Sequence, residues 1–173
     1  MGFSPSFYFR ERSLKMKITF SLNYKEFSIE VDGEKRALDF LREEMNIKSV
    51  KEGCGEGECG ACTIILDEKA VCSCMIMAAE LDGKKIITSE GLGNSSDPHP
   101  IQKAFVEKGG VQCGFCTPGF IMSTKALLDK TPSPNEKEIK KALEGNLCRC
   151  TGYEKIIDSV KYASELLNKN ENL

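Results

Sequence analysis

The sequence predicts an α+β fold with a sheet-containing first half and an all-helical second half. Residues 16–90 contain short runs in which apolar and polar side chains alternate, the pattern of half-buried strands. Residues 91–96 read Gly-Leu-Gly-Asn-Ser-Ser, a composition typical of a linker. After this segment, apolar residues recur only at helical spacing. We therefore expect one domain over residues 16–90 and a second over residues 91–173.

The first half is predicted to open with a hairpin and to continue through one helix. Residues 17–22 and 26–31 alternate, and Asn23-Tyr24-Lys25 lies between them as the turn. Residues 37–45 form an amphipathic pattern with Leu38, Leu41 and Met45 on one face. Further strands are expected at residues 63–66, around residue 71 and at residues 85–88.

The first fifteen residues differ from the rest of the chain, with four aromatic side chains and no clear period. The alternating pattern of the first predicted strand begins only after Met16. The sequence therefore predicts an N-terminal extension over residues 1–15, with Met16 as an alternative start of translation.

The second half contains signals for about four helices. Pro100 suits the first turn of one helix, and Thr117 followed by Pro118 suits the start of another. Residues 133–136 and 151–154 each carry the spacing of a capping box, and an apolar stripe follows residue 154.

Composition excludes several classes of protein. The chain has 24 basic and 26 acidic residues, a balance without the basic excess of a nucleic-acid-binding domain. No apolar run has the length of a membrane span, and no signal-peptide pattern occurs at the N-terminus. We expect a cytoplasmic protein that binds neither nucleic acid nor membrane.

Nine cysteines are unusual in a reducing compartment, where disulfides rarely persist. Such a density indicates metal binding or redox chemistry. The single histidine, His99, excludes zinc sites with paired histidines and also a Rieske centre, which needs two. Any metal in this chain is therefore expected to be held almost entirely by thiolates.

Cys54, Cys59 and Cys62 have the C-x4-C-x2-C spacing of a plant-type [2Fe–2S] site, whose fourth ligand lies farther along the chain. Glycines at positions 53, 55, 57 and 60 allow the loop to approach a cluster closely. Cys72 and Cys74 compete for the fourth position, since residues two apart on a strand point to the same side. Spacing alone leaves that choice open.

Cys113, Cys116, Cys148 and Cys150 form a second set, as a CGFC and a CRC motif. CGFC alone is compatible with a thioredoxin-like redox pair, but the βαβ context of such pairs is missing from the pattern. Each motif lies just before a predicted helix, and helix N-termini stabilise an anionic cluster. Four thiolates would serve zinc almost as well, so the residues favour iron–sulfur without excluding zinc.

Three stretches together resemble the iron–sulfur subunit of molybdenum hydroxylases, the group of xanthine dehydrogenase, aldehyde oxidoreductase and carbon monoxide dehydrogenase. They are residues 53–63, 112–119 and 145–153. The residues of the first stretch resemble those of xanthine dehydrogenase more than those of carbon monoxide dehydrogenase. The resemblance implies a β-grasp ferredoxin-like domain with one [2Fe–2S] cluster, followed by a four-helix-bundle domain with another.

The same resemblance implies the ligands and the partners. It assigns one cluster to Cys54, Cys59, Cys62 and Cys74, and the other to Cys113, Cys116, Cys148 and Cys150. It places Gln112 and Cys150 next to a molybdopterin on a large subunit, and it places FAD on a further subunit. Electrons would pass from molybdenum through the helical-domain cluster and the ferredoxin-like cluster to FAD. The alternatives are a free-standing two-cluster ferredoxin and a zinc-stabilised interaction module.

Overall fold

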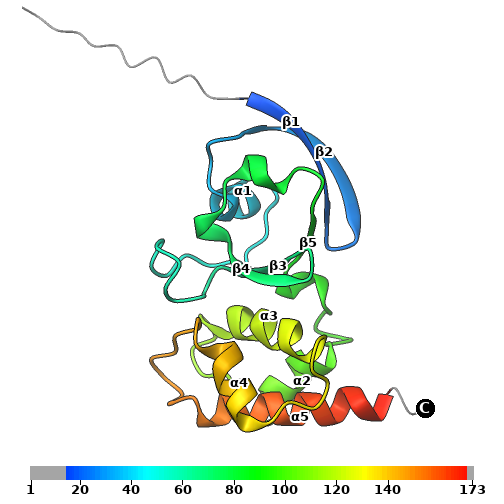
Figure 1. The fold of residues 1–173 in the computed structure, drawn as a ribbon, viewed down its shortest axis with the longest axis vertical. Helices are drawn as coiled ribbons and strands as arrows, with labels where there is room; N and C mark the ends of the chain where they lie inside the picture. Colours follow the sequence, from blue (N-terminus) through cyan, green and yellow to red (C-terminus); the bar gives the residue numbers. More distant parts are fainter. Residues whose placement is uncertain (1–14, 171–173) are drawn as a thin grey trace, which may run out of the picture.

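The first half of the chain folds as a mixed sheet with a short helix on one face, in a computed structural model that describes residues 15–170 (Figure 1). The sheet order is β2-β1-β5-β3-β4, with β1 parallel to β5 and the other neighbours antiparallel. The elements are β1 (Lys15–Leu22), β2 (Lys25–Asp32), α1 (Ala37–Glu43), β3 (Thr63–Leu66), β4 (Lys69–Cys72) and β5 (Lys85–Ile87). The first strand thus starts one residue inside the segment predicted as an extension, and residues 1–14 lie outside the described part of the chain.

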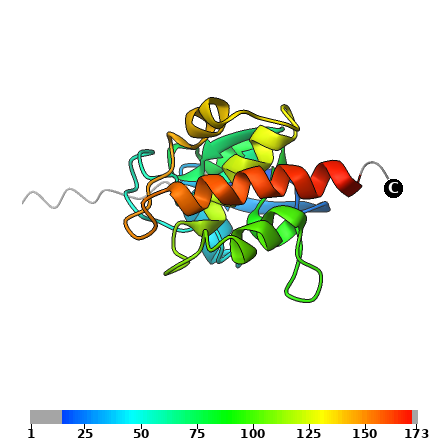
Figure 2. The ribbon, with the colours of Figure 1, turned by 90° about the horizontal axis from the view of Figure 1, so that it is seen from below.

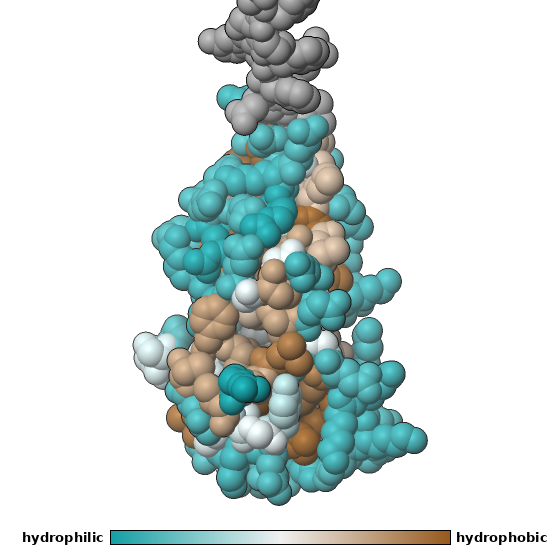
Figure 3. Space-filling view, turned by 90° about the vertical axis from the view of Figure 1, so that its left-hand side faces the viewer, coloured by the Kyte–Doolittle hydropathy of each residue, from teal (hydrophilic) through white to brown (hydrophobic). Residues whose placement is uncertain are grey.

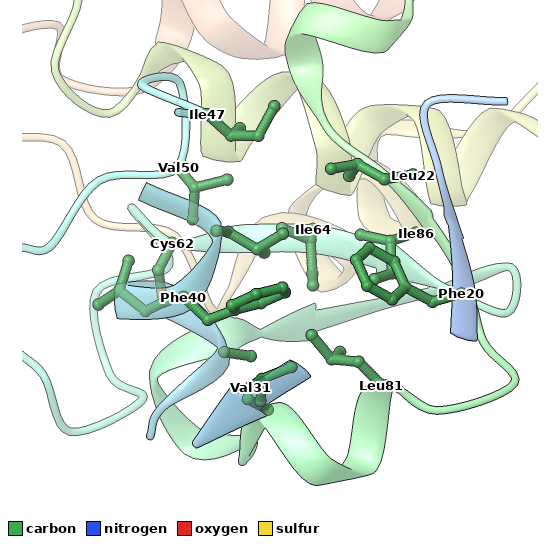
Figure 4. Packing of buried hydrophobic residues seen from close by; sticks show 14 of the residues in the cluster. Phe20, Leu22, Val31, Phe40, Ile47, Val50, Cys62, Ile64, Leu81 and Ile86 are labelled. Carbon is green, nitrogen blue, oxygen red and sulfur yellow. The ribbon is translucent and has the colours of Figure 1, made fainter. Parts of the chain in front are cut away.

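The alternating pattern of β1 builds the core of this half. Ile18, Phe20 and Leu22 are buried on one face of the strand and belong to one cluster with Phe40 of α1. Figure 4 shows Phe20, Leu22 and Phe40 in this packing. The rings of Phe20 and Phe40 meet edge to face with centroids 5.7 Å apart. Burying a side chain of this size stabilises the fold by about 1.5–3 kcal/mol. Cys62 belongs to the same buried cluster, so the core fixes one of the candidate ligands.

The hairpin turn is tighter than the sequence predicts. Lys25 pairs with Leu22, which leaves only Asn23 and Tyr24 in the turn. Both have a positive φ, 51° and 67°, as a two-residue turn with the twist of the flanking strands requires. The prediction of a three-residue turn was wrong because an asparagine at its first position accepts the left-handed conformation.

The second half contains four helices among its described residues: α2 (Pro100–Glu107), α3 (Thr117–Leu128), α4 (Glu136–Leu143) and α5 (Glu154–Asn170). Helices α2 and α5 pack together, and so do α3 with α4, α2 with α3 and α4 with α5. Their shared core includes Phe105, Phe120 and Ile156, all fully buried. The prediction of a helical second half is confirmed. None of the described helices is long and apolar enough to span a membrane.

Several helix ends differ from the capping signals in the sequence. Asn135, not Ser133, caps α4, because its side chain accepts from the Glu138 amide and the Glu138 carboxylate accepts from the Asn135 amide. Thr117 is the first residue of α3 rather than its cap. The Thr151 hydroxyl, predicted to cap α5, lies three residues before the helix, where it accepts from the Tyr153 amide at 3.3 Å and donates to Cys148 Sγ at 3.1 Å. The capping signals therefore located these helices without fixing their first residues.

The two halves share a packed boundary. Helix α3 lies against β3 on the side of the sheet away from α1 (Figure 1), and Ile65 of β3 belongs to the helical core. Asn146, only 3% exposed, crosses the boundary through its amide group. Its Nδ2 donates to the Gly60 carbonyl at 3.1 Å, and its Oδ1 accepts from the Ser123 hydroxyl at 2.6 Å.

Candidate metal centres

The candidate ligands lie in loops on one side of the molecule. The glycine-rich loop of the first half, the loop before α3 and the loop before α5 all occur on the left in Figure 1 and again on the left in Figure 2. All nine cysteines are free thiols. The two cysteine sets, which lie far apart in the chain, are therefore brought to a common side.

The loop over residues 53–62 is shaped around the Cys54 and Cys59 thiols. The Glu56 and Cys59 amides donate to Cys54 Sγ at 3.3 and 3.4 Å. These amides, the Glu56 one first, lower the pKa of Cys54 to about 7. A Cβ at Gly53 would come within 2.7 Å of Cys59 Sγ, so a side chain there would occupy the space of the thiol. The loop therefore favours an anionic sulfur and keeps room beside it.

Cys72 and Cys74 lie in different local structures. Cys72 ends β4, whereas Cys74 is buried in a short 3-10 turn (η1, Ser73–Met75). The thiols of both interact with Cys62, whose pKa is lowered to about 5, chiefly by Cys72. The expectation that the two cysteines share one strand was wrong, because the strand ends between them.

The carbonyl and the amide of Gly57 have opposite effects on negative charge at these two thiols. Cys72 Sγ lies 3.5 Å from the Gly57 carbonyl oxygen, to which it can only donate its proton. Burial raises the pKa of Cys74 to about 11, but the Gly57 amide acts in the other direction by donating to its sulfur. A thiolate is stabilised by an amide N–H and repelled by a carbonyl. The Gly57 amide therefore favours negative charge at Cys74, whereas the Gly57 carbonyl disfavours it at Cys72.

The second set also lies in two pairs. Cys113 Sγ and Cys150 Sγ are 3.7 Å apart. Two thiolates on one tetrahedral metal with bonds of about 2.3 Å would be about 3.8 Å apart. Burial and, after it, the neighbouring Cys148 thiol raise the pKa of Cys116 to about 12. The pairs are thus Cys113 with Cys150 and Cys116 with Cys148.

Polar groups around the second set orient its thiols. The Thr151 hydroxyl and amide both bond Cys148 Sγ, and they lower the pKa of Cys148 although burial acts to raise it. The Tyr153 hydroxyl accepts from the Cys148 amide at 3.0 Å. Cys116 occupies the residue before α3, so its sulfur lies near a helix N-terminus that favours negative charge.

Paired thiols fit a binuclear cluster. Among residues 15–170, no three His, Cys, Asp or Glu side chains are already grouped to hold a single metal ion. The thiols instead form couples, and a [2Fe–2S] cluster takes four cysteines, two on each iron. The donor set, the spacing of Cys113 and Cys150, and the room beside Gly53 all fit this group.

The two sites are in direct contact. The Leu147 amide, next to Cys148, donates to the Cys59 carbonyl at 3.0 Å. A cavity of about 230 Å³ is lined by residues of both cysteine loops, among them Cys59, Phe115 and Cys150. Lys51 Nζ, from the first half, donates to the Gly114 carbonyl at 3.0 Å. Candidate ligands of the two sites, Cys59 and Cys148, are therefore linked through a single hydrogen bond between the main chains of Leu147 and Cys59.

The side of the molecule with these loops is partly apolar. Figure 3 looks at it and shows brown surface that extends over both halves. Phe115 and Leu147 in the loops of the second set are 47% and 55% exposed, and Met75 next to Cys74 is 63% exposed. Cys113 and Cys150 of the second set are exposed, and so is Gln112 beside them.

Sequence reasoning missed two residues of this region. Asn146 lies in one of the three motif stretches but had no role assigned to it, and Lys51 had no signal at all. Their partners lie 86 and 63 positions away in the chain. Only the packing of the two halves brings them together.

Two family models match the chain. Residues 20–92 match a 2Fe-2S iron–sulfur cluster binding domain, and residues 88–161 match a [2Fe-2S] binding domain. The two matches meet at the segment that the sequence indicates as a linker.

Curated relatives match over most of the chain. It is 51% identical to the nicotinate dehydrogenase small FeS subunit of Eubacterium barkeri, over 87% of this chain and 96% of that protein. It is 48% identical to the xanthine dehydrogenase iron-sulfur-binding subunit of Escherichia coli O157:H7, over 71% of this chain and 79% of that one. The aldehyde oxidoreductase of Megalodesulfovibrio gigas is 43% identical over 86% of this chain, which corresponds to 17% of that longer protein.

Solved structures agree with these matches. Quinoline 2-oxidoreductase from Pseudomonas putida 86 superposes with a TM-score of 0.86 at 35% identity, covering 91% of this chain and 98% of that one. Aldehyde oxidoreductase from Desulfovibrio gigas superposes with a TM-score of 0.87 at 40% identity, covering 90% of this chain and 17% of that one.

Proposed function

Because the chain belongs to the iron–sulfur subunits of the molybdenum hydroxylase family, we propose that eight of its nine cysteines hold two [2Fe–2S] clusters in an electron-transfer subunit. The observation that carries this proposal is the pairing of thiols on one side of the molecule, with Cys113 Sγ 3.7 Å from Cys150 Sγ. When bound, the clusters supply one-electron carriers between a molybdopterin centre and FAD on partner subunits.

The first cluster is assigned to Cys54, Cys59, Cys62 and Cys74. Support for Cys74 comes from the Gly57 amide, which donates to its sulfur, whereas Cys72 faces the Gly57 carbonyl. Core packing around Cys62 and the amides at Cys54 hold this loop. Hydrogen bonds to the sulfurs also help to set a reduction potential.

The second cluster is assigned to Cys113, Cys116, Cys148 and Cys150. The loop before α3 and the loop before α5 each supply one thiol to each pair. Thr151 fixes the Cys148 sulfur, and the N-terminus of α3 adds positive potential at Cys116.

We assign residues 16–90 to a β-grasp ferredoxin-like domain and residues 91–173 to a four-helix bundle. The mixed sheet with α1 on one face supports the first assignment, and the pairwise packing of α2 to α5 supports the second. The family matches over residues 20–92 and 88–161 are consistent with this division.

The apolar side of the molecule is the face proposed to bind the large subunit. Exposed Phe115 and Leu147 would lose water contact there, which stabilises association by about 25 cal/mol per Å² of apolar area. Gln112 and Cys150 are exposed on the same side and are assigned to the molybdopterin-facing edge. FAD is assigned to a further partner near the first cluster.

A free-standing two-cluster ferredoxin is the competing function. An exposed apolar face beside the ligands favours a permanent complex, since a carrier that exchanges partners would leave that surface in water.

Purification of the native complex tests the proposal. We expect about four iron atoms and about four acid-labile sulfides per chain, with molybdenum and FAD on companion subunits and two distinguishable EPR signals on reduction. Zinc without acid-labile sulfide would contradict the cluster assignment. A monomeric protein that carries both clusters would favour the free ferredoxin.

A further inference from the structure

One lysine connects the first half of the protein to a candidate ligand of the second. The backbone amide of Lys51 donates to the Ala61 carbonyl at 3.2 Å, so its main chain is held by the glycine-rich loop. Its side chain extends across the boundary and donates to the Gly114 carbonyl at 3.0 Å. The ammonium also lies 5.2 Å from the centre of the Phe115 ring, within range of a cation–π contact.

The peptide group that Lys51 contacts also reaches a sulfur. The Gly114 carbonyl and the Phe115 amide belong to the same peptide unit. That amide lies two residues after Cys113 and is the largest cause of the lowered pKa of the Cys113 thiol. The ammonium therefore binds one end of a peptide unit whose other end acts on the thiol, and the three form a chain of polar contacts from Lys51 through Gly114–Phe115 to Cys113.

Such a chain transmits charge. A cation at the carbonyl end polarises a peptide and strengthens the hydrogen bond that its N–H donates, and this effect is larger where water is scarce. Lys51 is half-buried, and the exposed Cys113 and Phe115 lie on the face proposed to bind the large subunit, which would exclude water from them. A stronger hydrogen bond at the sulfur stabilises extra negative charge on the group that the thiolate binds.

We propose that Lys51 is a positioning residue that raises the reduction potential of the helical-domain cluster by polarising the Gly114–Phe115 peptide. The inference rests on the proposed function. One-electron reduction of a cluster with four thiolates changes its net charge from −2 to −3, and a nearby cation favours the more negative state. In this way the first domain helps to set the potential of the second.

The test is an EPR-monitored redox titration of the assembled complex with three chains: wild type, Lys51→Met and Lys51→Arg. Met keeps the length of the side chain but removes its charge and donor, whereas Arg keeps both. In Lys51→Met we expect the reduction equilibrium of the helical-domain cluster to fall about tenfold, which is 59 mV for one electron. We expect a smaller change at the ferredoxin-like cluster, and potentials close to wild type in Lys51→Arg.

Lys137→Met is the matched control, because Lys137 is exposed on α4 and its loss changes the net charge equally. If Lys51→Met does not assemble, Lys51→Gln, which retains a donor without charge, carries the same direction of shift. Unchanged potentials in the neutral variant would overturn the inference, and so would an equal fall at both clusters, which would indicate mere loosening of the two halves. Absence of the two signals from the wild type would instead contradict the proposed function.

Discussion

Cys72 and Cys74 acquire different surroundings although they are two positions apart. The strand ends at Cys72, and the following turn carries Cys74 into the buried cluster at 6% exposure. Sequence spacing could name both as candidates but could not choose, because the choice depends on which peptide group of Gly57 each sulfur meets. The residue types near Cys72 and Cys74 do not indicate which group of Gly57 each sulfur contacts.

Serine at each position separates the two roles. We expect Cys74→Ser to lose or strongly alter one EPR signal and to reduce the iron content by up to about half, because an oxygen ligand replaces a thiolate on one iron. Cys72→Ser is the matched control and should retain both signals, since a hydroxyl can still donate to the Gly57 carbonyl. The reverse result would make Cys72 the fourth ligand.

The ends of elements were harder to predict than their existence. Every helix of the second half was expected from its apolar spacing or its start signals, yet three of the expected caps were wrong. The reason is that serine, threonine and asparagine side chains bond whichever partner is nearest. Thr151 illustrates this, since its hydroxyl donates to Cys148 Sγ and accepts from the amide of Tyr153, the residue before α5 begins.

Helices α4 and α5 are joined by a carboxylate between two lysines. Lys140 and Lys161 each lie 2.7 Å from the Glu136 carboxylate, and they lower its pKa to about 2, with Lys140 as the larger cause. A carboxyl whose folded pKa lies below its unfolded value stabilises the fold at higher pH. That contribution is complete above about pH 4.5 and is lost as the pH falls toward 2.

Neutralising this carboxyl should therefore reduce the loss of unfolding free energy as the pH falls below about 4.5. We expect Glu136→Gln to be slightly less stable than wild type at pH 7 and to differ less from it at pH 2.5, as measured by urea denaturation across that range. Glu144→Gln, at an exposed pair with Lys141 at the opposite end of the same helix, is a control with one lysine partner only. A constant difference at all pH values would contradict the expectation.

At the scale of the whole molecule, a small set of hydrogen bonds around Asn146 joins the two halves. The division into a sheet half and a helical half was predictable, because linker composition and hydrophobic period both change near residue 91. The docking of the two halves was not predictable, because Asn146 donates to the Gly60 carbonyl, which lies 86 positions away in the chain. Gly60 itself has a positive φ of 65°, and a side chain there would collide with Asn146.

Asn146→Ala should weaken this set of hydrogen bonds. The substitution leaves the buried Ser123 hydroxyl without its partner and removes the donor to Gly60, which costs about 1–3 kcal/mol. Ser123→Ala removes only the contact at Oδ1 and should cost less. Denaturant unfolding of the holo protein measures both, and equal stability of Asn146→Ala and wild type would show that apolar packing alone holds the halves together.

The position of the C-terminal end of α5 matters for whether such a chain is translated separately or as part of a longer protein. The described part of this helix ends at Asn170, on the right in Figure 1, while the cysteine loops lie on the left. A polypeptide continued from that end would start away from the side that carries the cysteine loops. The unit therefore suits both separate translation and gene fusion, in keeping with its match to 96% of one small subunit and to 17% of one much longer oxidoreductase.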